Sequence, residues 1–268
     1  MTLVENTPGL LDALRGEMTP KFLATRDAVG TPNVVPVVSI LPADDDPDLL
    51  FFGNFLLRKS IRNLQADPRV GVLAITPALR GWRLKADFVE FQTTGPLVER
   101  QMNSSLLRYN AYTGIRNAGL LRVRSVEGEF QIGKLQVLAE YVLARIESLA
   151  RRGRGSGDEV SVRVPLPVQA EFARMVAVKV LAWTGNDGYP LVRPCLSLQP
   201  YGEHDLGGWM RSRMPAPPAG AWVSANILTF EAVSYQAKGR WSSSGSTGRL
   251  AVTEVYAGGP PLPGGRVA

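Results

Sequence analysis

The stretch "FLATRDAVGTPNVVPVVSILP" (22–42) returns 158 residues later as "VLAWTGNDGYPLVRPCLSLQP" (180–200). The two segments align without a gap and are identical at eight of 21 positions, among them Gly30 with Gly188. Each segment predicts two strands joined by a turn that contains glycine. Because the glycine and the flanking prolines are shared within one strand–turn–strand pattern, we interpret the chain as a degenerate tandem duplication of a small β-rich domain.

Weaker echoes support this interpretation and show where the copies differ. "GLLRVRSV" (119–126) is matched by "GRLAVTEV" (248–255), and "GWRLKADF" (81–88) loosely by "SYQAKGRW" (234–241). Between the second and fourth predicted strands the copies diverge, and there the second copy contains "MPAPPAG" (214–220). In the first copy, "LLRKSIRNLQADP" (56–68) predicts a helix that ends at Asp67-Pro68. The proline-rich segment of the second copy cannot form the same helix.

The clearest helix is "KLQVLAEYVLARIESLARR" (134–152), and "GRGSGD" (153–158) interrupts the chain after it. We therefore expect a first β-rich domain at 1–133, a connecting helix and linker at 134–158, and a second, degenerate copy of that domain at 159–268. The helix carries one apolar stripe, which is typical of a helix that packs on one face. The stripe consists of Leu135, Leu138, Val142, Ile146 and Leu149.

Composition excludes several kinds of protein. The chain has 268 residues, is 45% hydrophobic, carries a net charge of +6, and contains one cysteine (Cys195) and one histidine (His204). A single cysteine allows no disulfide within the chain, and a single histidine argues against a metal site built from several histidines. The sequence has no concentrated basic face of the kind that binds nucleic acid. It has no apolar run long enough to span a membrane. Its N-terminus lacks the pattern of a secretory signal. We expect a cytoplasmic protein that binds no metal.

"NFLLRKS" (54–60) is a candidate anion site. A predicted strand ends at Phe55 and a helix follows, so its first N–H groups and positive dipole end are available. Arg58 supplies a forked donor, Lys59 a point charge and Ser60 a hydroxyl, which together suit a phosphate monoester. The alternative is that these residues form an ordinary solvated helix face.

The first half resembles the FMN-binding split β-barrel family related to pyridoxamine 5′-phosphate oxidase. Three motifs carry the resemblance, in this order along the chain: G-x-P-N-V-x-P, R-K-S and N-L-x-x-D-P-R-V. The resemblance covers roughly Lys21 to Gly95 and reaches the second half only through its first hairpin and final strands. It implies a β-rich α+β fold of tandem antiparallel split β-barrels of Greek-key type with a few helices. It also implies FMN bound across an interface between two barrels.

The resemblance further implies cofactor-binding residues. Arg58, Lys59 and Ser60 would hold the flavin phosphate, and residues of two strands would approach the ring and ribityl chain, with a tryptophan and a lysine nearby. For the two valines and the tryptophan, plain core packing is an equal alternative. These further residues are Val37, Val38, Ser39, Phe52, Gly53, Asn54, Trp82 and Lys85.

The segment 101–119 has no counterpart that we can place in the family, and it is too long for a simple turn. It could cap the flavin and select a substrate, or form a surface excursion or a subunit contact. The chain also ends in "GGPPLPGGRVA", without the histidine of pyridoxamine phosphate oxidases proper, so oxidation of vitamin B6 is not expected. The cap candidates are Arg108, Tyr109, Asn110, Tyr112, Arg116 and Asn117.

The first functional hypothesis is an FMN-dependent oxidoreductase in which the flavin carries electrons or hydride to a small substrate. The second keeps the fold with the deazaflavin F420 or haem as cofactor. The third is a non-catalytic flavin-binding or assembly protein. We expect a homodimer, with a pseudo-dimeric monomer as the alternative. The sequence identifies neither the substrate nor an acid–base residue.

Overall fold

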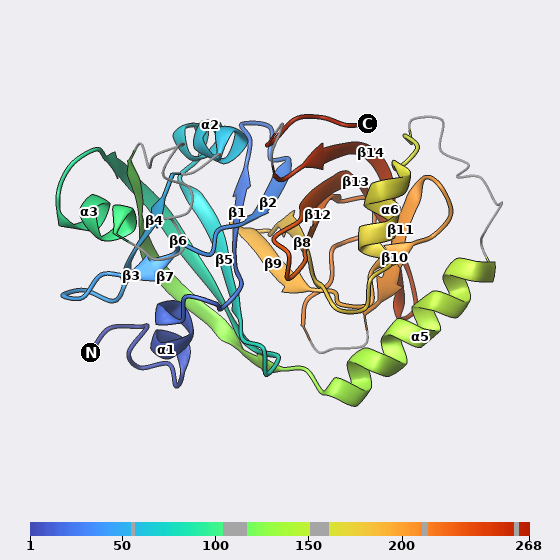
Figure 1. The fold of residues 1–268 in the computed structure, drawn as a ribbon, viewed down its shortest axis with the longest axis horizontal. Helices are drawn as coiled ribbons and strands as arrows, with labels where there is room; N and C mark the ends of the chain where they lie inside the picture. Colours follow the sequence, from blue (N-terminus) through green and yellow to red (C-terminus); the bar gives the residue numbers. More distant parts are fainter. Residues whose placement is uncertain (55–56, 104–116, 151–160, 211–213, 260–262) are drawn as a thin grey trace. The chain divides into compact units, whose positions relative to one another are not determined.

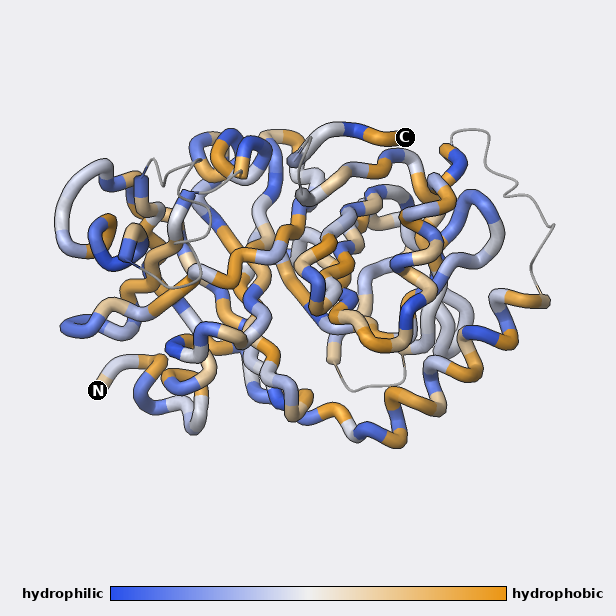
Figure 2. Tube along the Cα trace, viewed as in Figure 1, coloured by the Kyte–Doolittle hydropathy of each residue, from blue (hydrophilic) through white to orange (hydrophobic). Residues whose placement is uncertain are grey.

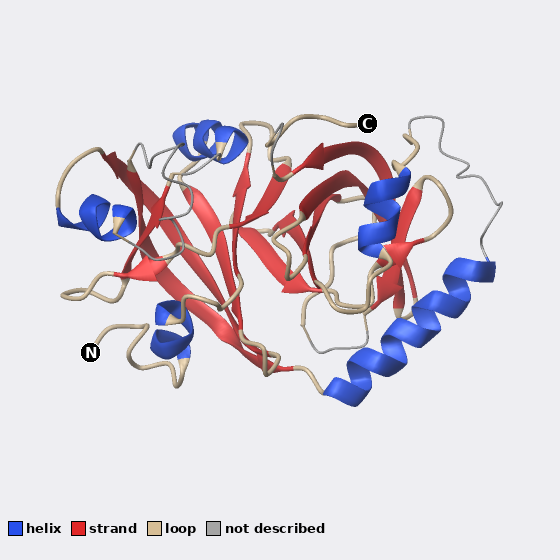
Figure 3. Ribbon diagram, in the orientation of Figure 1, coloured by secondary structure: helices blue, strands red, loops and turns tan. Residues whose placement is uncertain are grey.

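Two antiparallel sheets of seven strands each dominate the structure, a computed structural model (Figures 1 and 3). It describes residues 1–54, 57–103, 117–150, 161–210, 214–259 and 263–268.

The first sheet is built from the first half of the chain. Its hydrogen-bonded order is β2-β1-β5-β6-β7-β4-β3. The long strands β6 and β7 lie next to each other in the middle of this order, and the two-residue strand β3 forms one edge. The strands are β1 (Lys21–Arg26), β2 (Pro32–Pro36), β3 (Leu41–Pro42), β4 (Leu49–Gly53), β5 (Arg69–Ile75), β6 (Arg80–Gln92) and β7 (Ala118–Gln131).

The second sheet repeats this order. Starting from the equivalent edge, it runs β9-β8-β12-β13-β14-β11-β10, which is the order of the first sheet, strand for strand. The predicted fold class is confirmed: the chain is a β-rich, tandem split-barrel-like protein. The strands are β8 (Val178–Thr184), β9 (Pro190–Pro194), β10 (Gln199–Pro200), β11 (Asp205–Trp209), β12 (Trp222–Leu228), β13 (Ser234–Ser244) and β14 (Thr247–Ala257).

The register agrees with the weak sequence echo between β6 and β13. Lys85 lies opposite Gly71, and Lys238 lies opposite Ser224 at the equivalent place of the second sheet. In both sheets the pairing of this strand with its next neighbour shifts directly after the lysine. A β-bulge is a local feature of one strand, so its recurrence at one position supports the alignment of the two copies.

The hairpin that opens each copy has the same internal geometry. Gly30 and Gly188 have φ angles of 86° and 83°, a left-handed conformation that favours glycine. Each glycine donates its N–H to the carbonyl three residues earlier, at 2.9 Å. The shared glycine is therefore required by the turn, and the identity of the two segments at this position follows from backbone sterics.

Helices occupy different places in the two halves. Helix α2 connects β4 to β5 and ends one residue before Asp67, as the Asp-Pro pair predicts. The described residues 214–221 of the equivalent connection between β11 and β12 are not helical. Among the described residues, no helix is long and apolar enough to cross a membrane. The helices are α1 (Leu10–Arg15), α2 (Arg58–Ala66), α3 (Pro96–Met102), α5 (Lys134–Ala150) and α6 (Leu166–Phe172).

The chain forms two compact units, and each unit includes a short segment from the other half of the sequence. The first unit comprises residues 1–30, 36–131 and 185–191, and the second comprises residues 31–35, 132–184 and 192–268. The tip of the β8–β9 hairpin is thus part of the first unit, which sequence order alone would not indicate. The interruption predicted at 153–158 lies outside the described residues.

Helix α5 docks on the second sheet through its polar side chains. Ser148 Oγ donates to Pro200 O at 2.6 Å, and Gln199 Nε2 donates to Tyr141 O at 2.9 Å. Hydrophobic and hydrophilic residues alternate along the helix in Figure 2. The apolar stripe lies on the exposed side, with Leu135 82% exposed and Val142 45% exposed. The structure therefore differs from the usual amphipathic arrangement, because hydrogen bonds with residues of β10 satisfy the buried face of the helix.

Each sheet buries a lysine at equivalent positions of its first hairpin. Lys21 and Lys179 are fully buried. The carbonyl of each accepts a hydrogen bond of 2.8 Å from the N–H of the residue that directly follows β2 or β9, Val37 or Cys195 respectively. Lys21 Nζ donates to Gly16 O at 2.9 Å and to Val38 O at 3.2 Å. Among the described residues, Lys179 Nζ has no hydrogen-bond acceptor and lies 5.7 Å from the centre of the Tyr141 ring.

Burial lowers the pKa of Lys21 to about 8 and that of Lys179 to about 7. An unfolded chain keeps either lysine protonated up to its ordinary pKa near 10.5. The cost of burying the Lys179 charge is therefore largest below pH of about 7, where both states are protonated, and disappears toward pH of about 10.5.

We expect Lys179→Met to raise the melting temperature at pH 7 and to change it little at pH of about 10, because methionine removes the buried ammonium. Lys21→Met is the matched control and should lower stability, since it leaves two carbonyls without their donor. Differential scanning calorimetry across this pH range measures both. Destabilisation by Lys179→Met at pH 7 would show that the ammonium has a stabilising partner.

Candidate functional site

The residues predicted to approach the flavin ring lie at the junction of three elements. Val37, Val38 and Ser39 form the turn after β2, rather than continuing the strand as expected. Ser39 Oγ accepts a hydrogen bond of 3.2 Å from Gly53 N at the end of β4. The buried Gln101 of α3 donates from Nε2 to Ser39 O at 2.8 Å. The turn, β4 and α3 therefore meet at Ser39.

The Ser39 bond is a property of the fold in both halves. Ser197, the counterpart of Ser39, accepts a hydrogen bond of 3.0 Å from Trp209 N at the end of β11. The strand registers make Trp209 the counterpart of Gly53, because Gly53 lies opposite Ala118 and Trp209 opposite Thr247. The shared serine thus joins the first hairpin to the returning strand, whatever else Ser39 contacts.

Phe52, Gly53 and Asn54 have separate structural environments. The Phe52 ring is fully buried over Gly119, where a Cβ atom would lie 2.3 Å from its Cζ. Gly53 is buried, and Asn54 donates its N–H to Asn117 O at 2.9 Å. The end of β4 is therefore held to β7 and presents a glycine, where a ligand can approach the backbone closely.

Helix α2 begins with the three predicted phosphate-binding residues. Arg58 is exposed, Lys59 is half-buried and Ser60 is 1% exposed. The residue before the helix, Leu57, provides no side-chain cap, and the first turn contains no acidic residue. The start of α2 thus combines two cations and a hydroxyl with the positive end of the helix dipole, and its first turn contains no carboxylate to neutralise them.

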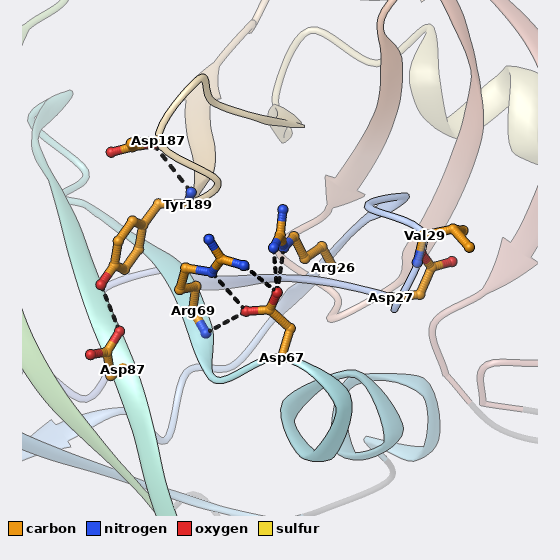
Figure 4. A network of polar contacts seen from close by, with 8 residues as sticks. All are labelled: Arg26, Asp27, Val29, Asp67, Arg69, Asp87, Asp187 and Tyr189. Atoms are coloured by element: carbon orange, nitrogen blue, oxygen red, sulfur yellow. Dashed lines mark hydrogen bonds and ion pairs between the residues drawn. The ribbon is translucent and has the colours of Figure 1, made fainter.

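The rest of α2 is anchored firmly to the first sheet. Asn63 Nδ2 donates to Thr25 Oγ1 at 3.0 Å. Asp67, directly after the helix, accepts hydrogen bonds from Arg69 Nε at 3.0 Å and Nη2 at 2.8 Å, and from Arg26 Nε at 2.7 Å (Figure 4). The hydrogen bonds from Arg69 hold the pKa of Asp67 far below its usual value, although burial opposes them, and Arg26 adds to the effect. This anchorage fixes the position of the first turn.

Trp82 and Lys85 lie on β6, away from the end of β4. Ten residues of strand, about 30 Å, separate Trp82 from Gln92, which pairs with Ala118 beside Gly53. Trp82 is 1% exposed, and the Arg80 guanidinium lies 5.0 Å from its ring centre. The burial of Trp82 thus supports the alternative that its ring packs in the core. Contact between Trp82 and a cofactor stays a prediction.

Lys85 is held by carboxylates within the first unit. Its Nζ lies 2.7 Å from Asp187 Oδ2 and 3.1 Å from Glu127 Oε2. Burial alone would lower the pKa of Lys85, but the hydrogen bonds to these carboxylates outweigh it and raise the pKa. Nearby, Tyr189 OH donates to Asp87 Oδ1 at 2.7 Å (Figure 4). Lys85 is thus a fixed, charge-compensated cation.

Sequence reasoning missed two features of this region. Asp67 was considered as a helix stop, whereas the structure makes it the acceptor of two arginines. The turn Gly185–Leu191 was assigned to the second half, yet Asp187 and Tyr189 belong to the first unit. Of the cap candidates, Asn117 is described, whereas the others lie outside the described residues. Those others are Arg108, Tyr109, Asn110, Tyr112 and Arg116.

Residues 11–137 match the family model described as pyridoxamine 5′-phosphate oxidase. Over these residues the first half of the chain is similar to that family. The match includes β1 to β7, the complete first sheet, and the whole of α2. It confirms the resemblance that the motifs indicated. No curated protein matches the chain.

Solved structures similar to the chain include several split-barrel proteins. An FMN-binding protein from Syntrophomonas wolfei is 14% identical, covering 49% of this chain and 88% of that one, with a TM-score of 0.39. HutZ, the haem-storage protein from Vibrio cholerae, is 19% identical and covers 51% and 99%, with a TM-score of 0.36. An F420 reductase is 20% identical and covers 43% and 94%, with a TM-score of 0.35.

Ser39→Ala and Ser197→Ala should each lower the free energy of unfolding by about 1 kcal/mol, because each leaves one backbone N–H without its acceptor. Urea titration followed by far-UV circular dichroism measures both losses. A loss confined to one variant would contradict a shared structural role of the two serines.

Asp67→Asn should cost about 2 kcal/mol of stability at pH 7, since it removes a carboxylate that accepts several charge-assisted hydrogen bonds. The depressed pKa makes this contribution present above the unfolded carboxyl pKa, and it is lost as the pH falls below about 4 toward the folded value. Asp44→Asn is the control, because Asp44 pairs with Arg100 at 2.9 Å but is 73% exposed. Equal losses in the two variants would contradict the anchoring role of Asp67.

Proposed function

We propose that the first half of the chain binds FMN, with its phosphate at the start of α2, and that the protein is an FMN-dependent oxidoreductase. The observation that carries this proposal is the first turn of α2. Arg58, Lys59 and Ser60 follow a residue that does not cap the helix, in a turn without acidic residues.

The donor set fits a phosphate monoester better than a neutral ligand. A dianionic group needs several donors and positive charge, and a guanidinium, an ammonium, a hydroxyl and the positive end of the helix dipole provide both. The helix is nine residues long and is anchored by Asn63 and Asp67, so these donors belong to a rigid element. A rigid first turn reduces the entropy lost when the phosphate binds.

The comparison of the two halves supports the same assignment. The second half has the hairpin, the serine bond and the strand order of the first, but no helix in the described residues 214–221. Its residue equivalent to Gly53 is Trp209, whose side chain would occupy the space that a ligand needs close to the backbone. Among the described residues, the features that we propose for cofactor binding are therefore found in the first half.

When bound, the isoalloxazine of FMN supplies the hydride and electron transfer, and the protein supplies orientation and electrostatics. Arg58, Lys59 and Ser60 would hold the phosphate and so fix one end of the cofactor. The turn Val37–Ser39 and the end of β4, Phe52–Asn54, would approach the ribityl chain and the ring. Because Ser39 is already an acceptor for Gly53 N, its remaining lone pair and its hydroxyl proton are what it can offer to a ligand.

The absorption spectrum of the purified protein also tests two other cofactors, F420 and haem. F420 would suit the same barrel, and its single visible absorption band differs from the two bands of a flavin. Haem iron usually takes histidine, cysteine, methionine or tyrosine as a ligand. The one histidine of the chain, His204, lies in the second half, so the first half has no histidine to offer a haem.

Arg58→Ala combined with Lys59→Ala should weaken FMN binding by about a hundredfold, because two charge-assisted contacts to the phosphate are lost. Absorption spectra of the purified protein and mass spectrometry of the released cofactor establish what is bound. Titration of the cofactor-free protein then gives the affinity.

Arg62→Ala is the matched control, because Arg62 is an exposed arginine one turn further along α2. It should bind FMN nearly as tightly as the unmodified protein. Equal affinity of the double variant, with folding intact, would refute the phosphate assignment. Oxidation of reduced flavin by candidate acceptors in the loaded protein distinguishes an enzyme from a non-catalytic flavin-binding protein.

A further inference from the structure

Helix α5 exposes an unusually continuous apolar surface. Leu135, Leu138, Val142, Ile146 and Leu149 are 82%, 48%, 45%, 60% and 48% exposed. Between Leu135 and Ala150, the other exposed positions are alanines, Ala139 and Ala150, so no charged residue interrupts the surface. We call these five larger side chains the α5 stripe. Monomeric proteins seldom leave such a contiguous stripe in water.

The opposite face of α5 already has its partners. Ser148 and Tyr141 are bonded to the second sheet as described above, Tyr201 OH donates to Glu147 Oε2 at 2.9 Å, and Ala144 is fully buried. Rotating the helix to bury the stripe would break these hydrogen bonds and leave buried polar groups without partners. The stripe is therefore held outward by the docking of the helix.

The spacing of the stripe is symmetric about its central residue. Leu135 and Leu138 lie seven and four residues before Val142, and Ile146 and Leu149 lie four and seven residues after it. In an antiparallel pair of such helices with a two-fold axis beside Val142, Leu135 meets Leu149 and Leu138 meets Ile146. A two-fold interface must be complementary to itself, and this spacing has that property.

We propose that α5 is a homodimer interface, in which the α5 stripes of two copies pack antiparallel around a two-fold axis at Val142. Packing the five side chains of the α5 stripe from each copy would bury on the order of 1,000 Å² of accessible surface in total. This area is near the lower limit for a specific interface. The dimer is therefore weak and forms in a concentration-dependent manner.

Sedimentation velocity of the full chain over a range of concentrations tests the dimer. Val142→Glu should raise the dissociation constant about tenfold or more, because it places two carboxylates against each other at the axis. Phe230→Glu is the control, since Phe230 is 76% exposed, lies outside α5 and should leave the dimer unchanged. Circular dichroism checks that both variants fold. A dimer that persists in Val142→Glu, or a protein that is monomeric throughout, overturns the proposal.

Cysteine cross-linking tests the antiparallel arrangement. Val142→Cys should form a disulfide with its own copy, and Leu135→Cys should link to Leu149→Cys when the two proteins are mixed. Leu135→Cys should not link to itself, because its two copies would lie about 21 Å apart along the axis. The native Cys195 is 4% exposed and provides the uncross-linked background. Predominant self-linking of Leu135→Cys would indicate parallel helices and overturn the proposal.

A lipid surface is the competing occupant of an apolar helix face. Co-sedimentation of the unmodified protein with phosphatidylglycerol–phosphatidylcholine vesicles, abolished by Val142→Glu, would assign the stripe to membranes and overturn the dimer. If the protein does not bind vesicles and Val142→Cys forms a disulfide with its own copy, the dimer proposal is supported.

Discussion

A hydrogen bond from a strand amide to a serine hydroxyl joins the first hairpin of each sheet to its returning strand. In the first unit it links Ser39 to Gly53, and in the second it links Ser197 to Trp209. The bond fixes where β4 or β11 ends relative to the turn before it, and so where the next connection begins. The helix in one half and the proline-rich segment in the other both follow this fixed point.

The same scaffold thus supports two different connections, and the anion site that we propose lies in the first of them. Helix α2 starts four residues after Asn54, and its far end is held by Asp67 between Arg26 and Arg69. These arginines lie on β1 and at the start of β5, so the helix is attached to the sheet whose turn carries Ser39. Both halves keep the serine bond although the described residues 214–221 of the second connection are not helical, so this bond does not depend on the helix.

Local patterns predicted most of the fold. Strand alternation, the shared glycine and the Asp67-Pro68 pair predicted the hairpins and the end of α2, because each depends on neighbours in sequence. The position of Asp187 beside Lys85 could not be predicted, because 102 residues separate them and the copies share no residue there that would indicate pairing. The clustering of Arg26 and Arg69 on Asp67 likewise depends on strand pairing, which periodicity does not specify.

The orientation of α5 shows why an apolar stripe alone does not identify the buried face of a helix. Apolar burial favours the stripe, but Tyr141, Glu147 and Ser148 complete hydrogen bonds with Gln199, Tyr201 and Pro200. Leaving those buried polar groups unpaired would cost about 1–3 kcal/mol each, comparable to the gain from burying one apolar side chain. Since a second copy can cover the stripe without breaking these bonds, outward orientation and self-association satisfy both requirements, whereas inward rotation satisfies only one.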